Sequence, residues 1–431
     1  MIGVIEHVIK LKNVCVHLIP IKKFKTVRVE LKYKAPIERN TITKRAVLTS
    51  VLSNGSKKYP SKRHLQEKLD DLYGAYFKID GFKAGTFHVL NVNMEFANRK
   101  YINDQSTVSS NALAFLNEVI SHPNVENDAF DEVIVKREKE TIRQYIRSIK
   151  DNKTGYAQMR LIDEMCQGEP YQIHHLGYEE DLDLINGKNL YEYYRKLLLE
   201  ETVDLFVVGD FDYQAMETAI KENMADIIKT PIGRPVYPQE VSSKKFALSD
   251  PREIIEKEPI QQAKLHIGYR TNTTFRDSDF AGMLVCNMIL GGYSGSKLFV
   301  HVREKNSLAY YVNSRWDLFS DKLFVNSGIA PSDYEKAREI IEEQLKAMKK
   351  GDISEMELKE AKTLLVGQYR KALDGADSII DLLYQQELMN KALSTERIIE
   401  QIQQVQLDDV VRNANKIQAD TIYLLTGEDV L

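Results

Sequence analysis

The stretch TPIGRPVYPQEVSSKKFALSDPREIIEKEP (230–259) decides how this chain is organised. It contains five of the eleven prolines and lacks apolar periodicity, which is typical of an extended linker. It also divides the 431 residues into two nearly equal halves. We therefore expect a first lobe at 1–228, a Pro-rich linker at 229–260 and a second lobe at 261–431.

The two halves repeat one another. Each contains an alternating strand pattern, later a long helical pattern, and finally a strand that ends in glycine. The matched segments are VELKYKA (29–35) and LHIGYRT (265–271), VKREKETIRQYIRSIKD (135–151) and KEAKTLLVGQYRKALD (359–374), and VDLFVVGDFD (203–212) and DTIYLLTGED (420–429). This order predicts an α+β fold of two duplicated lobes, each a mostly antiparallel sheet covered by helices, arranged as a clamshell.

Composition excludes several classes of protein. The chain has 59 basic and 63 acidic residues, a net charge of -4, 43% hydrophobic and 28% charged residues. This balance indicates a soluble globular protein that binds neither nucleic acid nor membrane. No secretory signal or membrane span is recognisable, so we expect a cytoplasmic protein. Cys15, Cys166 and Cys286 lie too far apart in sequence for a metal-binding or disulfide motif and are expected to be reduced core thiols.

The nine histidines show no helical metal-binding pattern, because no two of them are four residues apart. His174 and His175 are adjacent, and neighbouring side chains point in different directions on any regular element. We therefore expect surface or loop histidines and no histidine-based metal site. The sequence also lacks a GxSxG nucleophile motif and a phosphate-binding loop.

The segment LGGYSGSKLFVHVREKNSLAYYV (290–312), together with the duplicated halves, the linker and the VVGD strand, resembles the inverted-motif zinc peptidases. This family includes insulinase, pitrilysin and the mitochondrial processing peptidase. The resemblance extends over nearly the whole chain. Its most specific part is REKNSLAYYV, since the family carries an arginine and a tyrosine seven residues apart there, and Arg303 and Tyr310 match them.

The zinc motif of that family, HxxEH, aligns with AVLTSVLSNGSKKYPS (46–61) and has lost its chemistry. Ala46 and Ser50 occupy the two imidazole positions, and Thr49 occupies that of the glutamate base. Further on, the position of the third ligand falls on Tyr145, although Glu138 matches the first of the family's two helical glutamates. Methyl and hydroxyl groups cannot bind zinc or activate its water. We therefore expect no metal, no cofactor and no hydrolysis by this chain alone.

The resemblance implies a non-catalytic, substrate-holding subunit of a two-chain peptidase. A homologous partner would carry HxxEH, and Arg303 and Tyr310 would orient or polarise a carbonyl of a peptide or unfolded polypeptide. Two alternatives remain at these residues, an ion pair for Arg303 and a core position for Tyr310. The alternating segment AGTFHVLNVNMEF (84–96) is either a sheet edge that pairs with substrate or an ordinary internal strand. The alternative function is a structural or chaperone-like scaffold with no role in proteolysis.

Overall fold

The computed structural model describes residues 5–102, 108–229 and 250–427. The chain forms two compact units, which we call the first lobe and the second lobe. The first lobe comprises Met1–Arg147, Ile173–Gln239 and Ala376–Ile380, and the second comprises Ser148–Gln172, Glu240–Gly375 and Asp381–Leu431.

These units differ from the predicted boundaries at three places. Ala376–Ile380 falls in the predicted second lobe but belongs to the first. Residues 148–172 precede the predicted linker but belong to the second lobe. The predicted linker at 229–260 falls partly on 230–249, outside the described residues, and its later part contains a strand, β9 (Arg252–Lys257). All three differences arise from tertiary contacts, which local composition does not reveal.

The first lobe contains a six-stranded sheet in the order β1-β2-β8-β3-β5-β4. The strands are β1 (His7–Leu11), β2 (Val14–Pro20), β3 (Thr26–Pro36), β4 (Tyr76–Ala84), β5 (Phe87–Ala97) and β8 (Thr202–Gly209), and a separate pair is formed by β6 (Val125–Glu126) and β7 (Ala129–Phe130). Only β2 and β8 pair in parallel among the described strands of this sheet.

The second lobe contains a five-stranded sheet in the order β11-β12-β10-β13-β9. Its strands are β9, β10 (Ala263–Arg270), β11 (Ala309–Trp316), β12 (Lys322–Ile329) and β13 (Gln418–Thr426). Read from the opposite end, the order β9-β13-β10-β12-β11 matches β2-β8-β3-β5-β4, and the one parallel pair occupies the same place in both. This shared topology confirms the duplication and the α+β fold class.

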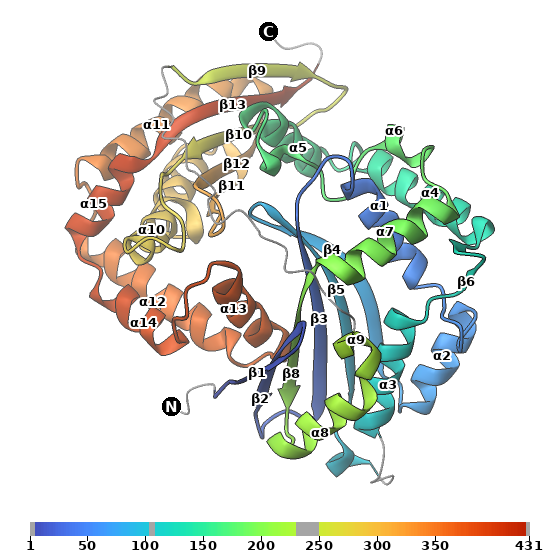
Figure 1. The fold of residues 1–431 in the computed structure, drawn as a ribbon. Helices are drawn as coiled ribbons and strands as arrows, with labels where there is room; N and C mark the ends of the chain where they lie inside the picture. Colours follow the sequence, from blue (N-terminus) through green and yellow to red (C-terminus); the bar gives the residue numbers. More distant parts are fainter. Residues whose placement is uncertain (1–4, 103–107, 230–249, 428–431) are drawn as a thin grey trace. The chain divides into compact units, whose positions relative to one another are not determined.

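Helices cover one face of the first sheet (Figure 1). The helices of this lobe are α1 (Ile42–Leu52), α2 (Lys62–Asp71), α3 (Val108–Ser121), α4 (Glu132–Ser148), α6 (Glu179–Leu182), α7 (Gly187–Glu200), α8 (Tyr213–Asn223) and α9 (Ala225–Lys229). Alternation along β3 explains the arrangement: Val29 and Leu31 enter the core with Leu48 of α1, whereas Glu30 and Lys32 lie on the opposite face.

The second sheet is covered on both faces. One core lies between the sheet and α10 (Phe280–Asn287), α11 (Tyr334–Lys349), α12 (Glu355–Ala372), α14 (Thr395–Gln404) and α15 (Leu407–Lys416). On the other face, α5 (Lys153–Met165) packs Leu161 and Met165 against Phe324 and Tyr423. Gly268 of β10 permits this approach, because a Cβ atom there would lie 2.4 Å from Met165 Sδ. The remaining helix, α13, spans Ala376–Leu388.

The segment 84–96 is not a sheet edge. Its strand, β5, lies between β3 and β4, so the alternative of an ordinary internal strand is correct. The edge of the first sheet on that side is β4, which pairs only with β5 among the described strands. The alternating pattern of β5 predicts correctly which of its residues share a face of the sheet, but it does not predict which strands lie beside it.

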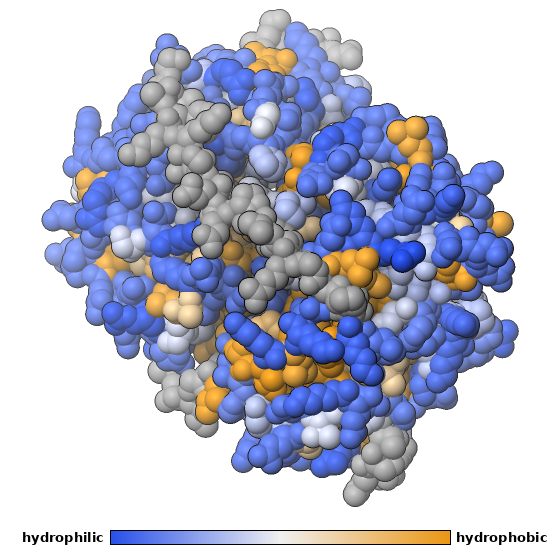
Figure 2. Space-filling view, in the orientation of Figure 1, coloured by the Kyte–Doolittle hydropathy of each residue, from blue (hydrophilic) through white to orange (hydrophobic). Residues whose placement is uncertain are grey.

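The surface seen in Figure 2 is mostly hydrophilic, with apolar residues gathered in separate patches. Within the described residues, no helix has the length and apolar character that crossing a membrane requires.

Candidate functional site

Helix α1 carries the positions at which the resemblance places the zinc motif. Ala46 is buried in the apolar core, with 6% of its surface exposed. The Thr49 hydroxyl donates a hydrogen bond to the Arg45 carbonyl at 2.8 Å. The Ser50 carbonyl accepts a hydrogen bond of 2.8 Å from the Asn54 side chain. All three residues therefore serve the packing and hydrogen bonding of the helix.

Helix α4 carries the remaining two positions of that motif. Glu138 is 4% exposed, and its Oε1 lies 3.0 Å from Arg137 Nε and 3.8 Å from Lys62 Nζ. Tyr145, at the third-ligand position, is 57% exposed. The motif thus retains one carboxylate, already paired with two cations, where zinc requires three protein ligands and a bound water. These residues do not fit a zinc ion.

A buried ion pair anchors α1 beside the lost motif. Arg45 is 2% exposed and forms a two-pronged interaction with Glu201, whose Oε2 lies 2.8 Å from Arg45 Nη2. The same guanidinium donates hydrogen bonds to the Tyr33 carbonyl at 2.7 Å, to the Tyr193 hydroxyl at 3.1 Å and to His88 Nδ1 at 2.8 Å. Burial and the charge of Arg45 lower the pKa of His88, so a neutral imidazole accepts this bond. The network stabilises the first lobe.

Arg303 and Tyr310 lie on neighbouring elements of the second lobe, and both are exposed. Arg303 is in a π-helical segment, η4 (Phe299–Lys305), where its guanidinium carbon lies 4.8 Å from the centre of the Phe299 ring. It forms no ion pair with any carboxylate of the described residues. Tyr310 is 66% exposed, so it is not a core residue.

The backbone explains why Tyr310 points outward. Strand β11 is an edge strand, and its register with β12 shifts between Ala309 and Tyr311. A bulge of this kind inserts an unpaired residue and redirects its side chain. Tyr310 is that residue, whereas Val312 and Trp316 farther along β11 remain buried. π-Helical turns and bulges are both frequent at functional sites.

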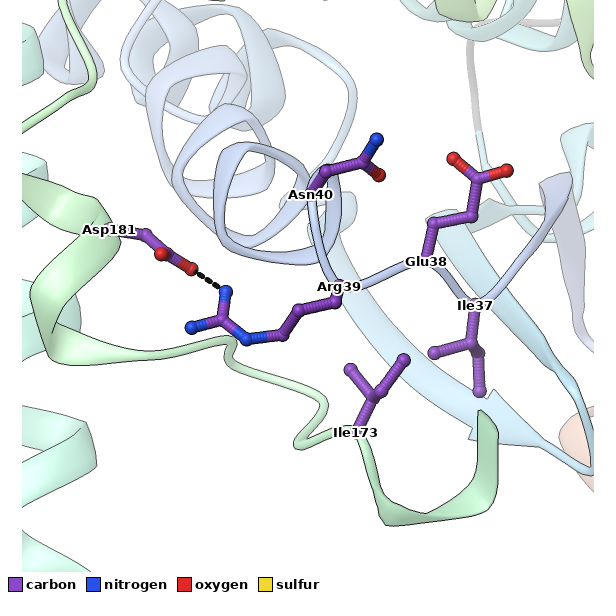
Figure 3. A pocket seen from close by; sticks show the side chains of 6 residues that line it. All are labelled: Ile37, Glu38, Arg39, Asn40, Ile173 and Asp181. Carbon is purple, nitrogen blue, oxygen red and sulfur yellow. Dashed lines mark hydrogen bonds and ion pairs between the residues drawn. The ribbon is translucent and has the colours of Figure 1, made fainter. Parts of the chain in front are cut away.

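A broad depression of about 790 Å³ opens beside the start of α1 (Figure 3). Arg39 lines this depression, and its charge is already neutralised, because it pairs with Asp181 and, at 2.9 Å, with Glu180. Its guanidinium carbon also lies over the Tyr178 ring, 3.7 Å from the ring centre. The depression contains none of the site residues expected from the sequence. Its lining residues are Ile37, Glu38, Arg39, Asn40, Ile173 and Asp181.

Comparison with known proteins assigns the family. Residues 185–365 match the family model described as "Peptidase M16 inactive domain". The chain is 38% identical over 413 residues, 96% of both chains, to the "Probable inactive metalloprotease YmfF" of Bacillus subtilis. The chain belongs to the M16 peptidase family.

Solved structures of M16-like and related chains share this fold. A conserved protein from Enterococcus faecalis is 33% identical, covers 98% of this chain and 99% of its own, and superposes with a TM-score of 0.89. A structure described as a peptidase M16 inactive domain, from Pseudomonas fluorescens, is 17% identical, covers 99% of both chains and superposes with a TM-score of 0.78. The second likeness concerns the fold alone.

Membership of the M16 family, together with the lost zinc set, supports a non-catalytic role for this chain. Two of its structural features were not expected from the sequence. One is the Arg45 network, which a search for metal ligands does not examine. The other is the position of three histidines: His17, His88 and His266 are buried on β2, β5 and β10, at 3%, 2% and 0% exposure. The expectation of surface or loop histidines was wrong for these three, because the strand faces that carry them are covered.

Proposed function

We propose that this M16 chain is the substrate-holding subunit of a two-chain peptidase whose homologous partner carries the HxxEH zinc site. One observation supports this proposal above the others. The first lobe has lost every imidazole of the zinc motif, whereas the second lobe presents Tyr310 to solvent, and also Arg303, which forms no ion pair with a carboxylate of the described residues.

The chemistry of the two residues suits a peptide backbone. A guanidinium stays charged at any physiological pH and offers several donors in a fixed geometry. The phenol of Tyr310 adds one more donor at the bulge of β11. Both can donate to a carbonyl oxygen and so orient or polarise it for attack by a water on the partner's metal.

These two contacts do not hold a peptide by themselves. At about 1 to 3 kcal/mol each, they fall short of the roughly 8 kcal/mol of micromolar binding. Backbone pairing at a sheet edge supplies sequence-tolerant affinity. In the first lobe one such edge is β4, where Tyr76 is 50% exposed and the outer backbone groups have no strand beside them among the described residues.

A peptide titration tests this proposal. An unstructured fluorescent peptide should bind the chain, alone or mixed with its partner, and Arg303→Ala should weaken binding by about tenfold, the equivalent of 1.4 kcal/mol. Arg397→Ala is the matched control, because Arg397 is an exposed arginine of the second lobe that pairs with Glu400 on α14. Equal affinities of wild type and Arg303→Ala would favour the alternative, a scaffold without a role in proteolysis.

We further propose that the protein acts in the cytoplasm. All three cysteines are free, with Cys166 and Cys286 buried and Cys15 half-buried, as expected in a reducing compartment.

A further inference from the structure

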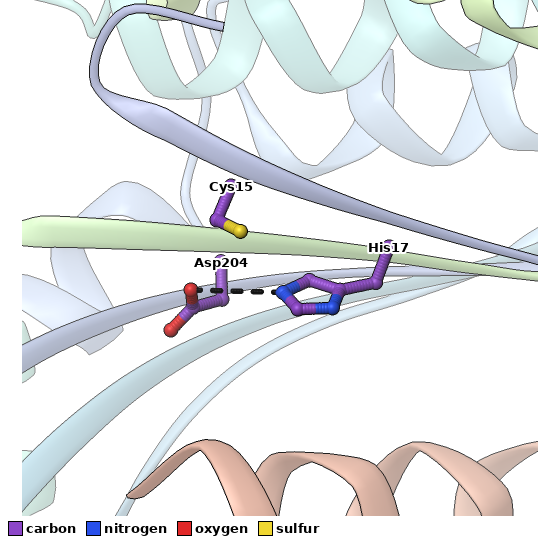
Figure 4. A group of neighbouring side chains, drawn as sticks. All are labelled: Cys15, His17 and Asp204. Atoms are coloured by element: carbon purple, nitrogen blue, oxygen red, sulfur yellow. Dashed lines mark ion pairs between the residues drawn. The ribbon is translucent and has the colours of Figure 1, made fainter. Parts of the chain in front are cut away.

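Three side chains of metal-ligand type share one face of the first sheet. Cys15 and His17 are two residues apart on β2, so both point to the same side. Strand β8 runs parallel to β2 and places Asp204 directly opposite Cys15. One potential ligand atom of each residue lies within 4.8 Å of those of the other two (Figure 4).

This group is separate from the lost zinc motif. Val16 and Leu18, which alternate with Cys15 and His17, enter the apolar core together with Val47 of α1. The three ligand-type residues therefore occupy the sheet face opposite α1. None of them belongs to a position that the family resemblance assigned.

Two buried polar atoms in the group lack a hydrogen-bond partner. His17 Nε2 and Asp204 Oδ2 are both unsatisfied among the described residues, on side chains 4% and 6% exposed. The nearest approach, from His17 Nε2 to Asp204 Oδ1, is 3.8 Å, which is too long for a hydrogen bond. An unsatisfied buried donor or acceptor costs about 1 to 3 kcal/mol, and a ligand coordinated by both atoms would relieve this cost.

The imidazole is already held in the orientation that a metal ligand needs. Glu6 Oε1 lies 2.6 Å from His17 Nδ1, and the Phe206 ring stacks on the imidazole at 4.2 Å with an interplanar angle of 10°. A carboxylate on Nδ1 fixes the tautomer that leaves Nε2 free to coordinate, as in carboxylate–histidine–zinc arrangements.

We propose that Cys15, His17 and Asp204 form a site for a divalent transition-metal ion, with zinc as the best fit. A thiolate, an imidazole and a carboxylate form a mixed sulfur, nitrogen and oxygen set that suits zinc and disfavours magnesium or calcium. Tetrahedral zinc, with bonds of about 2.0 to 2.3 Å, separates its ligand atoms by roughly 3.3 to 3.7 Å. The side chains need to close by about 1 Å, and water would occupy the fourth position.

A proton on His17 is the competing occupant. Metal ions bind the thiolate and the neutral imidazole, so binding of a divalent cation releases protons and weakens as pH falls. The inference departs from the sequence-based expectation of no metal, and it does not depend on the proposed peptidase role.

Metal titration of the full chain decides between the two occupants. After treatment with a chelator, the protein should bind one zinc ion from zinc chloride in calorimetry. Cobalt(II) chloride should produce a thiolate-to-cobalt absorption band. Cys15→Ser should abolish the band and weaken zinc binding at least tenfold, and Asp204→Asn should also weaken it. Glu6→Gln should reduce affinity by about 10- to 100-fold, because Glu6 only orients His17.

Controls keep the result interpretable. His64→Ala, on the exposed face of α2, should leave binding unchanged. Cys15→Ser is a nearly isosteric change of a half-buried side chain, so this variant should fold. It therefore tests the site even if His17→Ala fails to fold. The proposal is overturned if zinc does not bind at one ion per chain, or if Cys15→Ser and Asp204→Asn bind it as wild type does. The group then holds only a proton.

Discussion

Replacing Arg45 by alanine should destabilise the first lobe by about 3 to 5 kcal/mol, the cost of removing one partner from a buried ion pair. The reason is structural. Glu201, 6% exposed, would keep its carboxylate but lose its cation, and His88 and the Tyr33 carbonyl would each lose a donor. In a lobe of about 200 residues, each kcal/mol shifts the melting temperature by about 2 to 4 °C, so we expect a fall of roughly 6 to 20 °C.

Differential scanning calorimetry of three proteins measures this loss: wild type, Arg45→Ala, and Arg45→Ala with Glu201→Gln. The double variant should be more stable than Arg45→Ala, because a neutral amide is easier to bury than an unpaired carboxylate. Burial raises the pKa of Glu201, and Arg45 opposes this rise. Without Arg45, protonated Glu201 is favoured in the folded state.

The destabilisation should therefore be largest at neutral pH and shrink as pH falls toward the ordinary pKa of glutamate. The reasoning would be refuted if Arg45→Ala lost less than about 1 kcal/mol of unfolding free energy and this loss did not shrink in acid, since an exposed ion pair behaves in that way.

Two further predictions concern the second lobe. Burial tends to raise the pKa of Glu169, but Arg270 and Lys322 outweigh this effect and lower the pKa. The ionised Glu169 therefore stabilises the fold above the ordinary glutamate pKa, and this stabilisation is lost as pH falls through the pKa of the folded state. Thermal melts from about pH 7 to pH 3 should therefore show wild type losing more stability than Glu169→Gln; parallel curves would contradict this. Gly268→Ala should lower the free energy of unfolding by about 1 to 3 kcal/mol and speed hydrogen exchange in α5, because the added Cβ meets Met165. The control is Gly367→Ala on α12, where an added Cβ has nothing within 4 Å, and this variant should be as stable as wild type or more stable. Unchanged exchange in α5 would show that Met165 yields without cost.

The sequence predicted the α+β class and the duplication because both depend on periodicity and order. It did not predict which strands are neighbours. Strand β9 lies in a proline-rich stretch without alternation, and its place beside β13 comes from backbone pairing. Helix α5 precedes the linker, yet its apolar face fits the second sheet at Gly268. For the same reason, the sequence left open whether 84–96 is an edge or an internal strand, and the structure shows an internal strand.

The candidate site, too, could be predicted from the sequence only in part. Lost zinc ligands can be read position by position, since Ala46 and Ser50 have no chemistry that folding could restore. The exposure of Arg303 and Tyr310 follows from a π-helical turn and a bulge, which leave no signature in the sequence. A search for histidines four apart detects helical metal sites only. Cys15 and His17 have the two-residue spacing of a strand, and their third partner, Asp204, is distant in sequence.

The central claim is that this M16 chain has lost the hydrolytic centre but kept the side chains that hold a substrate. The most direct measurement is turnover of an unstructured peptide by an HxxEH-bearing homologue mixed with this chain. We predict activity only in the mixture, a fall in kcat/KM of about ten- to hundredfold with Arg303→Ala, and no change with Arg397→Ala. Full activity of the homologue alone, or equal turnover with Arg303→Ala and wild type, would contradict the claim.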